Sequence, residues 1–135
     1  MTKVCSRGII FDGDNLAMVF SSRFGAYKFP GGRRELKESR VDTLVREVRE
    51  ETGLEVDRDS IIEYGMARRI HKGNEGMKYV QKNYYYLCQV CGSVSEPVLE
   101  PHERYAGYTL DFVEPADALE MNRRYLCRHA EETAI

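Results

Sequence analysis

At 135 residues, the chain has room for one domain with a hydrophobic core and is too short for two. Its apolar fraction of 42% and charged fraction of 31% are ordinary for a soluble globular protein. A net charge of −2 and a pI near 6.0 exclude a general attraction to nucleic acid, so a polyanionic substrate would need a metal ion and local arginines.

Two expected strands open the chain. Residues 3–11 and 16–22 are rich in β-branched and apolar residues, and the turn-forming sequence at 12–15 joins them, which predicts a β-hairpin. Residues 27–29 form a short extended piece that leads to Pro30, because the residue before a proline disfavours the helical region.

A helix is expected next, because apolar residues recur at the spacing i, i+3, i+4 and i+7 of a helix with one buried side. Ser39 or Arg40 lies near its start, and Gly53 ends it. The apolar positions are Val41, Leu44, Val45 and Val48.

The second half of the chain predicts strands, turns and a closing helix. The expected strands cover residues 54–56, 61–70, 77–90 and 108–113. Polar turns are expected at 57–60 and 73–76, and the polar stretch 92–105 with its two prolines is expected to be a loop. Pro115 opens a terminal helix, whose apolar residues are Ala118, Leu119, Met121, Tyr125 and Leu126.

The cysteines predict no disulfide framework, because Cys5, Cys88, Cys91 and Cys127 lack regular spacing. A zinc site at Cys88 and Cys91 would need distant partners such as Cys5 or His102, so buried or half-buried free cysteines are the expected state. With no signal peptide and no long apolar run, we expect a cytoplasmic protein with reduced thiols and no membrane segment.

Three glutamates of the expected helix indicate a metal site. At about 100° per residue, Glu47, Glu50 and Glu51 share roughly a third of the circumference, away from the valines. Like charges at this spacing destabilise a helix by roughly 0.2–0.5 kcal/mol per pair, so the cluster needs a cation. Mg²⁺ fits, because it binds one or two carboxylates together with waters and substrate phosphates. The alternative is a solvated face on which Arg46 and Arg49 neutralise their neighbours.

The residues before the helix favour the metal site. The sequence Phe29-Pro30-Gly31-Gly32 is a rigid turn followed by two glycines that let the backbone approach a metal or a phosphate. From this turn onward the chain resembles the Nudix hydrolase signature, Gly-x5-Glu-x7-Arg-Glu-U-x-Glu-Glu-x-Gly-U with U aliphatic, at every specified position. The matching residues are Gly32, Glu38, Arg46, Glu47, Val48, Glu50, Glu51, Gly53 and Leu54.

The resemblance implies a fold and a reaction. The fold is a single-domain α/β/α sandwich around a mixed β-sheet over residues 1–135, in agreement with the α/β layered domain that the order of elements predicts. The reaction is hydrolysis of a nucleoside diphosphate linked to another moiety, by attack of water on a phosphorus. The expected partner is a small nucleotide, and the expected cofactor is Mg²⁺, with Mn²⁺ as the alternative.

The resemblance also implies roles for single residues. Gly32 and Glu38 would lie beside the metal ion, and Arg46 would hold a metal-binding glutamate by an ion pair rather than touch substrate. Arg23 follows the second strand, where relatives often keep an arginine near the substrate's phosphates; an exposed loop charge is its alternative. The implied metal ligands are Glu47, Glu50, Glu51 and the Gly31 carbonyl.

The general base is not fixed by the resemblance, because family members use either a glutamate of the helix or an acid of a downstream loop. Glu47 is the candidate on the helix. Glu100 and Glu103 are the candidates in the expected loop before the last strand, and a solvated charge is the alternative for both. Loss of a general base typically lowers turnover by about 10²-fold.

Substrate class and partners stay open at this stage. Residues 69–72 carry no proline or tyrosine of the kind that marks subfamilies for ADP-ribose, diadenosine polyphosphates or coenzyme A. The second hypothesis is a Nudix-fold module that senses a nucleotide without cleaving it, although such modules commonly lose signature carboxylates and this chain keeps them all. A nucleic-acid partner is not expected, because no basic patch is visible. A homodimer through the last helix or the tyrosine-rich strand is compatible with the sequence.

Overall fold

The structure is a computed structural model that describes residues 1–72 and 76–133 of the chain. Residues 73–75 of the expected turn at 73–76 lie outside the described residues. The elements, in chain order, are β1 (Thr2–Ile9), β2 (Phe11–Asp12), β3 (Asn15–Ser21), β4 (Ala26–Lys28), β5 (Gly31–Arg33), α1 (Arg40–Thr52), β6 (Glu55–Val56), the 3₁₀ turn η1 (Arg58–Ser60), β7 (Ile62–Lys72), β8 (Lys78–Leu87), β9 (Val90–Cys91), α2 (Pro101–Ala106), β10 (Tyr108–Val113) and α3 (Pro115–Thr133).

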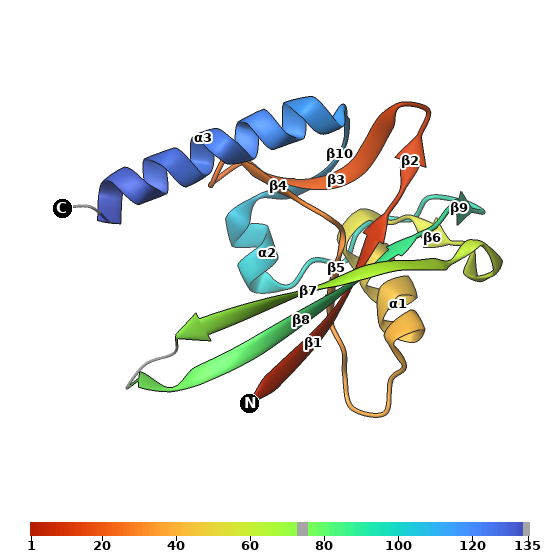
Figure 1. Cartoon of the computed structure of the whole chain (residues 1–135). Coiled ribbons are helices and arrows are strands. Elements are labelled where there is room, and N and C mark those ends of the chain that lie inside the picture. The colour runs from red at the N-terminus through yellow and green to blue at the C-terminus, as the bar shows by residue number, and fades with distance from the viewer. Residues whose placement is uncertain (73–75, 134–135) are drawn as a thin grey trace.

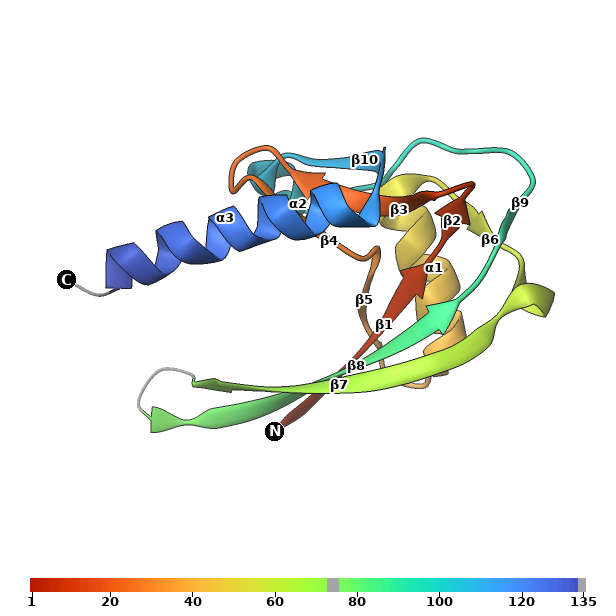
Figure 2. The ribbon, with the colours of Figure 1, turned by 45° about the horizontal axis from the view of Figure 1, so that its top comes forward.

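Two β-sheets form the body of the molecule (Figure 1). The first has the strand order β5-β1-β8-β7, and it is mixed because β1 runs parallel to β8 and antiparallel to β5. The second has the order β10-β3-β2, with β4 paired to β3, and a two-stranded sheet joins β6 to β9. Figure 2 shows α1 beside β1 and β5, and α3 running past β4. The predicted α/β class with a mixed sheet is confirmed.

The predicted helix is α1, and its ends follow from its capping residues. The Ser39 side chain accepts a hydrogen bond from the Asp42 backbone N–H at 3.0 Å, and Gly53 takes the left-handed conformation that stops the helix. Leu44 and Val48 are completely buried. Because each buried side chain of this size stabilises the fold by about 1.5–3 kcal/mol, the two residues fix the rotation of α1 and therefore the direction of its glutamates. The core also contains Ile10, Ala17, Leu54, Val56, Tyr86 and Cys88.

The predicted hairpin between residues 3–11 and 16–22 is wrong in its first strand. The run 3–11 is divided at Ile10, so that β1 belongs to the mixed sheet and only the two-residue β2 pairs with β3. Ile10 is buried, and its carbonyl accepts a hydrogen bond from the Ala17 backbone N–H at 2.8 Å. The chain therefore passes from one sheet to the other within the apolar stretch Ile9-Ile10-Phe11, where composition gives no signal.

The expected loop at 92–105 is wrong at its end, because α2 begins at Pro101. This helix has six residues, which is too few to show an apolar period. Its start is nevertheless marked by Pro101 in the first turn, and its end by Gly107 in the left-handed conformation.

The closing helix α3 is confirmed, but few of its apolar side chains are buried. Ala118 is buried, whereas Leu119 is 72% exposed and Leu126 is 63% exposed. The side-chain amide of Asn122 attaches α3 to β4, since it accepts from the Tyr27 backbone N–H at 2.7 Å and donates to the Tyr27 carbonyl at 2.8 Å. Among the described residues, no helix combines the length and apolarity that crossing a membrane requires.

Candidate active site

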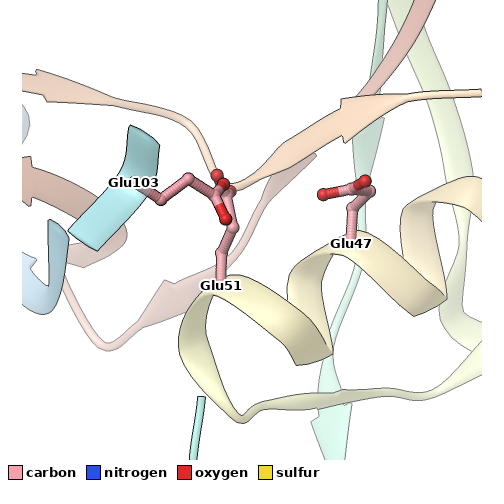
Figure 3. A group of neighbouring side chains, drawn as sticks. All are labelled: Glu47, Glu51 and Glu103. Atoms are coloured by element: carbon pink, nitrogen blue, oxygen red, sulfur yellow. The ribbon is translucent and has the colours of Figure 1, made fainter. Parts of the chain in front are cut away.

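Three glutamates from two helices lie close together, with the carboxylates of Glu51 and Glu103 meeting and that of Glu47 to one side (Figure 3). Glu47 and Glu51 lie one turn apart on α1, and Glu103 reaches toward Glu51 from α2. Each contributes a carboxylate oxygen, and these oxygens lie within 4.8 Å of one another. In the described part of the chain, this is the only group of histidine, cysteine, aspartate and glutamate side chains close enough to hold a metal ion. The four cysteines are free, and Cys5 and Cys88 are buried as expected, whereas Cys91 and Cys127 are exposed.

Glu103 is positioned by the first turn of α2. Its carboxylate oxygen Oε1 accepts a hydrogen bond from the Glu100 backbone N–H at 2.9 Å, which satisfies a donor that the start of a helix leaves free. The side chain is only 6% exposed. The same carboxylate therefore caps α2 and faces Glu51.

Glu51 is the most deeply buried of the three, at 1% exposure. Its Oε1 accepts from the Gly31 backbone N–H at 2.8 Å, and its Oε2 pairs with the Lys28 ammonium at 2.8 Å. Burial raises the pKa of Glu51 to about 7 against the opposing charge of Lys28, and a hydrogen bond with Glu103 adds to the rise. A second cation would remove the cost of keeping this carboxylate charged.

The site fits a hard divalent cation. All three donors are carboxylates, the oxygen ligands that Mg²⁺ and Mn²⁺ prefer. Burial also raises the pKa of Glu47, with smaller contributions from the nearby carboxylates. Two buried acids and one half-buried acid, whose ionised forms disfavour one another, are stabilised together when a divalent ion binds between them.

Both glycines of the turn before the helix permit close approaches at the site. A Cβ at Gly31 would clash with the Ser6 carbonyl, and the φ of 149° at Gly31 is one that other residues rarely adopt. A Cβ at Gly32 would clash with the Glu47 carboxylate. The Gly31 carbonyl, which was expected to be a metal ligand, accepts a hydrogen bond from Arg7 Nη1 at 3.0 Å in this structure.

Arg46 lies at the centre of a network on the flank of α1. Its guanidinium donates to Glu38 at 2.7 and 2.9 Å, to Glu47 at 2.8 Å and to Glu50 at 3.2 Å. The hydrogen bonds from Arg46 hold the pKa of Glu38 at about 2, well below its usual range. The ion pair expected between Arg46 and Glu47 is therefore present, and Glu38 is paired with the arginine rather than with the cluster.

The structure separates three other expected site residues from the cluster. Glu50 is half-buried and faces Arg46, so it is not one of the three converging carboxylates. Arg23 lies with its guanidinium 4.0 Å from the centre of the Tyr105 ring and does not line the pocket beside the cluster. Glu100 does line that pocket, but its side chain is 62% exposed.

The cluster forms part of the wall of a pocket of about 720 Å³. Sequence reasoning missed several of its lining residues, among them Lys28 and Tyr108, which lie 4.4 Å apart from ammonium to ring centre. The one visible signal was a charged residue in the short extended piece before Pro30. Cations also line the pocket, namely Lys3, Arg7, Lys28, Arg33 and Arg34.

A model of the NUDIX domain matches residues 2–129 of the chain. The chain belongs to the Nudix family. Membership confirms the resemblance seen in the sequence, and it makes the protein a pyrophosphohydrolase that cleaves a nucleoside diphosphate linked to another moiety. Nudix hydrolases generally use a divalent metal, and the carboxylate cluster is suited to hold one.

Solved structures share the Nudix fold of this chain. A NUDIX hydrolase from Nitrosomonas europaea is 21% identical with a TM-score of 0.69, over 91% of this chain and 79% of that one. A MutT NUDIX hydrolase from Burkholderia pseudomallei is 18% identical with a TM-score of 0.65, over 84% of both chains. An ADP-ribose pyrophosphatase from Streptococcus suis is 29% identical with a TM-score of 0.50, over 73% of this chain and 67% of that one. No curated protein matches the sequence.

Proposed function

We propose that this Nudix enzyme uses Mg²⁺, with Mn²⁺ as a substitute, and that Glu47 and Glu51 hold the ion beside Glu103. The convergence of three carboxylate oxygens within 4.8 Å supports this proposal. When bound, the ion supplies charge neutralisation on the diphosphate and a lowered pKa for the attacking water. The nucleotide lies in the adjoining pocket, where the lining arginines and lysines complement its phosphates.

The protein's own residues orient this chemistry. The Gly31 backbone N–H holds one oxygen of Glu51, and Arg46 holds Glu47. Glu103 takes the proton of the attacking water in our proposal, because it is buried next to Glu51 and comes from a different helix. Glu47 is the alternative base on α1, and the exposed Glu100 is the alternative on the approach to α2.

The test is phosphate release with and without Mg²⁺ over a panel of nucleoside triphosphates, oxidised dGTP, ADP-ribose, nucleotide sugars, diadenosine polyphosphates, coenzyme A and NADH. We expect metal-dependent cleavage of one class by the wild type and at least about a 10³-fold loss in Glu51→Gln. Glu50→Gln is the matched control, because the neighbouring glutamate on the same helix lies outside the cluster.

Two results would contradict the proposal. Equal losses in Glu50→Gln and Glu51→Gln would show that the ligands are those expected from the signature alone. No cleavage in the panel, with nucleotide binding that survives Glu51→Gln, would favour the non-catalytic sensing module.

Location and oligomeric state stay predictions. Four free cysteines agree with a cytoplasmic location. The exposed leucines Leu119 and Leu126 make α3 the candidate contact for a homodimer. Light scattering tests this contact, since a particle mass of 15.6 kDa is that of a single chain.

A further inference from the structure

Lys28 combines a fixed backbone with a long, flexible side chain. Its strand β4 pairs with β3, and the double hydrogen bond between Asn122 and Tyr27 fixes the preceding residue on the other side. The side chain is 34% exposed on the pocket wall. A four-carbon stem on a fixed backbone lets the ammonium move by several ångström without disturbing the strand.

The ammonium of Lys28 has two neighbours in the pocket. It lies 2.8 Å from Glu51 Oε2 and 4.4 Å from the centre of the Tyr108 ring. The aromatic ring attracts a cation independently of Glu51. Both neighbours line the same pocket, so loss of the Glu51 contact leaves the ammonium beside Tyr108, facing the space for the substrate.

Lys28 and Arg46 are the two cations that pair with glutamates of the cluster, and they differ in the number of acids that each pairs with. Arg46 is paired with Glu38, Glu47 and Glu50 at once, whereas Glu51 is the one acid that Lys28 pairs with among the described residues. The Lys28 ammonium also neutralises the carboxylate that a divalent ion needs. Lys28 and the ion therefore compete for Glu51.

We propose that Lys28 is the internal counter-ion of Glu51, which a divalent cation displaces, and that the displaced ammonium then binds the diphosphate of the substrate. The second half rests on the proposed function. It makes Lys28 a substrate-binding residue whose availability depends on metal loading. Lys28 can then bind the phosphates of the substrate only after the metal ion has bound to Glu51.

The proposal predicts opposite effects of one substitution on two ligands. Lys28→Met keeps most of the stem and removes the charge. Because one positive charge near the metal is lost, we expect the variant to bind Mg²⁺ about tenfold more tightly than the wild type. Because the diphosphate loses a cation, we expect its KM at saturating Mg²⁺ to rise about tenfold while kcat changes less. A residue that only supports the fold would weaken both.

Binding of Mg²⁺ is measured without substrate, from the rise in melting temperature during a titration at pH 9, where protons compete little for Glu51. Lys28→Arg is the charge-retaining control and is expected to bind Mg²⁺ like the wild type. Lys3→Met removes a lysine that lines the pocket without pairing with a described acid, and it is expected to leave Mg²⁺ affinity unchanged.

Each half of the proposal has its own contrary result. Unchanged or weaker Mg²⁺ binding by Lys28→Met overturns the counter-ion role, and an unchanged KM overturns the role in substrate binding. If the wild type cleaves nothing in the substrate panel, the proposed function has failed, and the Mg²⁺ titration still decides whether Lys28 competes for Glu51.

Discussion

Glu38 and Glu51 are both specified by the Nudix signature, yet the structure treats them in opposite ways. Glu38 accepts two hydrogen bonds from Arg46, and its pKa falls to about 2. Glu51 is buried with a single ammonium beside it, and its pKa rises to about 7. The fold supplies Glu38 with its own counter-ion and leaves Glu51 short of positive charge.

This difference supports the proposal that Glu38 is a structural carboxylate and that Glu51 is a metal ligand. A carboxylate that is ionised and fully paired gains little from a metal ion, whereas a buried carboxylate with a raised pKa gains a great deal. The Arg46 side of α1 therefore holds the helix and its glutamates in place, and the Lys28 side is where we propose that the cation binds.

The largest expected effect comes from removing the positive charge of Arg46. Arg46→Met leaves Glu38 and Glu47 as partly buried carboxylates without their partner, which we expect to cost about 3 kcal/mol of unfolding free energy. This corresponds to a fall of about 10 °C in melting temperature for a chain of this length. Arg123→Met in the exposed pair with Glu120 is the control, with an expected change below about 2 °C. Similar losses in both variants would show that the Arg46 network is an ordinary surface feature.

The next effect concerns catalysis on the metal-binding side. Glu103→Gln keeps an oxygen that can accept from the Glu100 backbone N–H, so α2 should remain capped. Turnover should fall by about 10²-fold, as for other losses of a general base, with an unchanged melting temperature. Glu100→Gln should retain near-normal turnover. If Glu100→Gln is the slower variant, the exposed residue is the base.

A smaller effect is the pH dependence of metal binding. In our proposal Mg²⁺ binds ionised Glu51, whose pKa of about 7 means that the proton competes with the ion below neutral pH. Apparent Mg²⁺ affinity should therefore fall about tenfold from pH 8 to pH 6. Calorimetric titration at the two values checks this, and proton release on binding should appear at pH 6. An affinity independent of pH over this range would mean that Glu51 is ionised before the metal arrives.

The same pKa values give opposite trends in the stability of the metal-free protein. Glu38 binds its proton less tightly in the folded protein than in the unfolded chain. Its contribution to the free energy of unfolding is therefore complete above its ordinary pKa of 4.5 and is lost as the pH falls toward 2. Glu51 binds its proton more tightly in the folded protein than in the unfolded chain. Its contribution to the free energy of unfolding is therefore complete below pH 4.5 and is lost as the pH rises through 7. Melting curves of Glu38→Gln should differ most from the wild type near neutral pH, and those of Glu51→Gln should show higher stability than the wild type at pH 8.

The sequence predicted the part of the site that depends on local spacing. The limits of α1 followed from Ser39 and Gly53, whereas the pairing of Arg46 with Glu47 was implied by the resemblance. Lys28 and Glu103 reach Glu51 from other elements. Contacts between separate elements cannot be predicted from the spacing of residues along the chain. Glu50 shows the converse, since a shared helical face with Glu51 did not bring it to the cluster.

The fold was predictable to a similar depth. The strand at 108–113 and the helix from Pro115 were marked by composition and a proline, whereas the division of residues 3–11 between two sheets depends on long-range pairing. The helix α2 was missed although Pro101 and Gly107 mark its ends, because six residues show no period.

The smallest expected effect tests the arginine that the resemblance associated with phosphates. The Arg23 guanidinium stacks on Tyr105 outside the pocket, so Arg23→Ala removes an exposed cation–π contact and nothing that lines the substrate space. We expect its KM to stay within about twofold of the wild type, below the change for Lys28→Met. A KM that rises as much as in Lys28→Met would mean that the substrate's phosphates extend past the pocket to α2. The phosphates would then be bound by two cations, Arg23 in the turn between β3 and β4 and Lys28 at the end of β4, rather than by Lys28 alone.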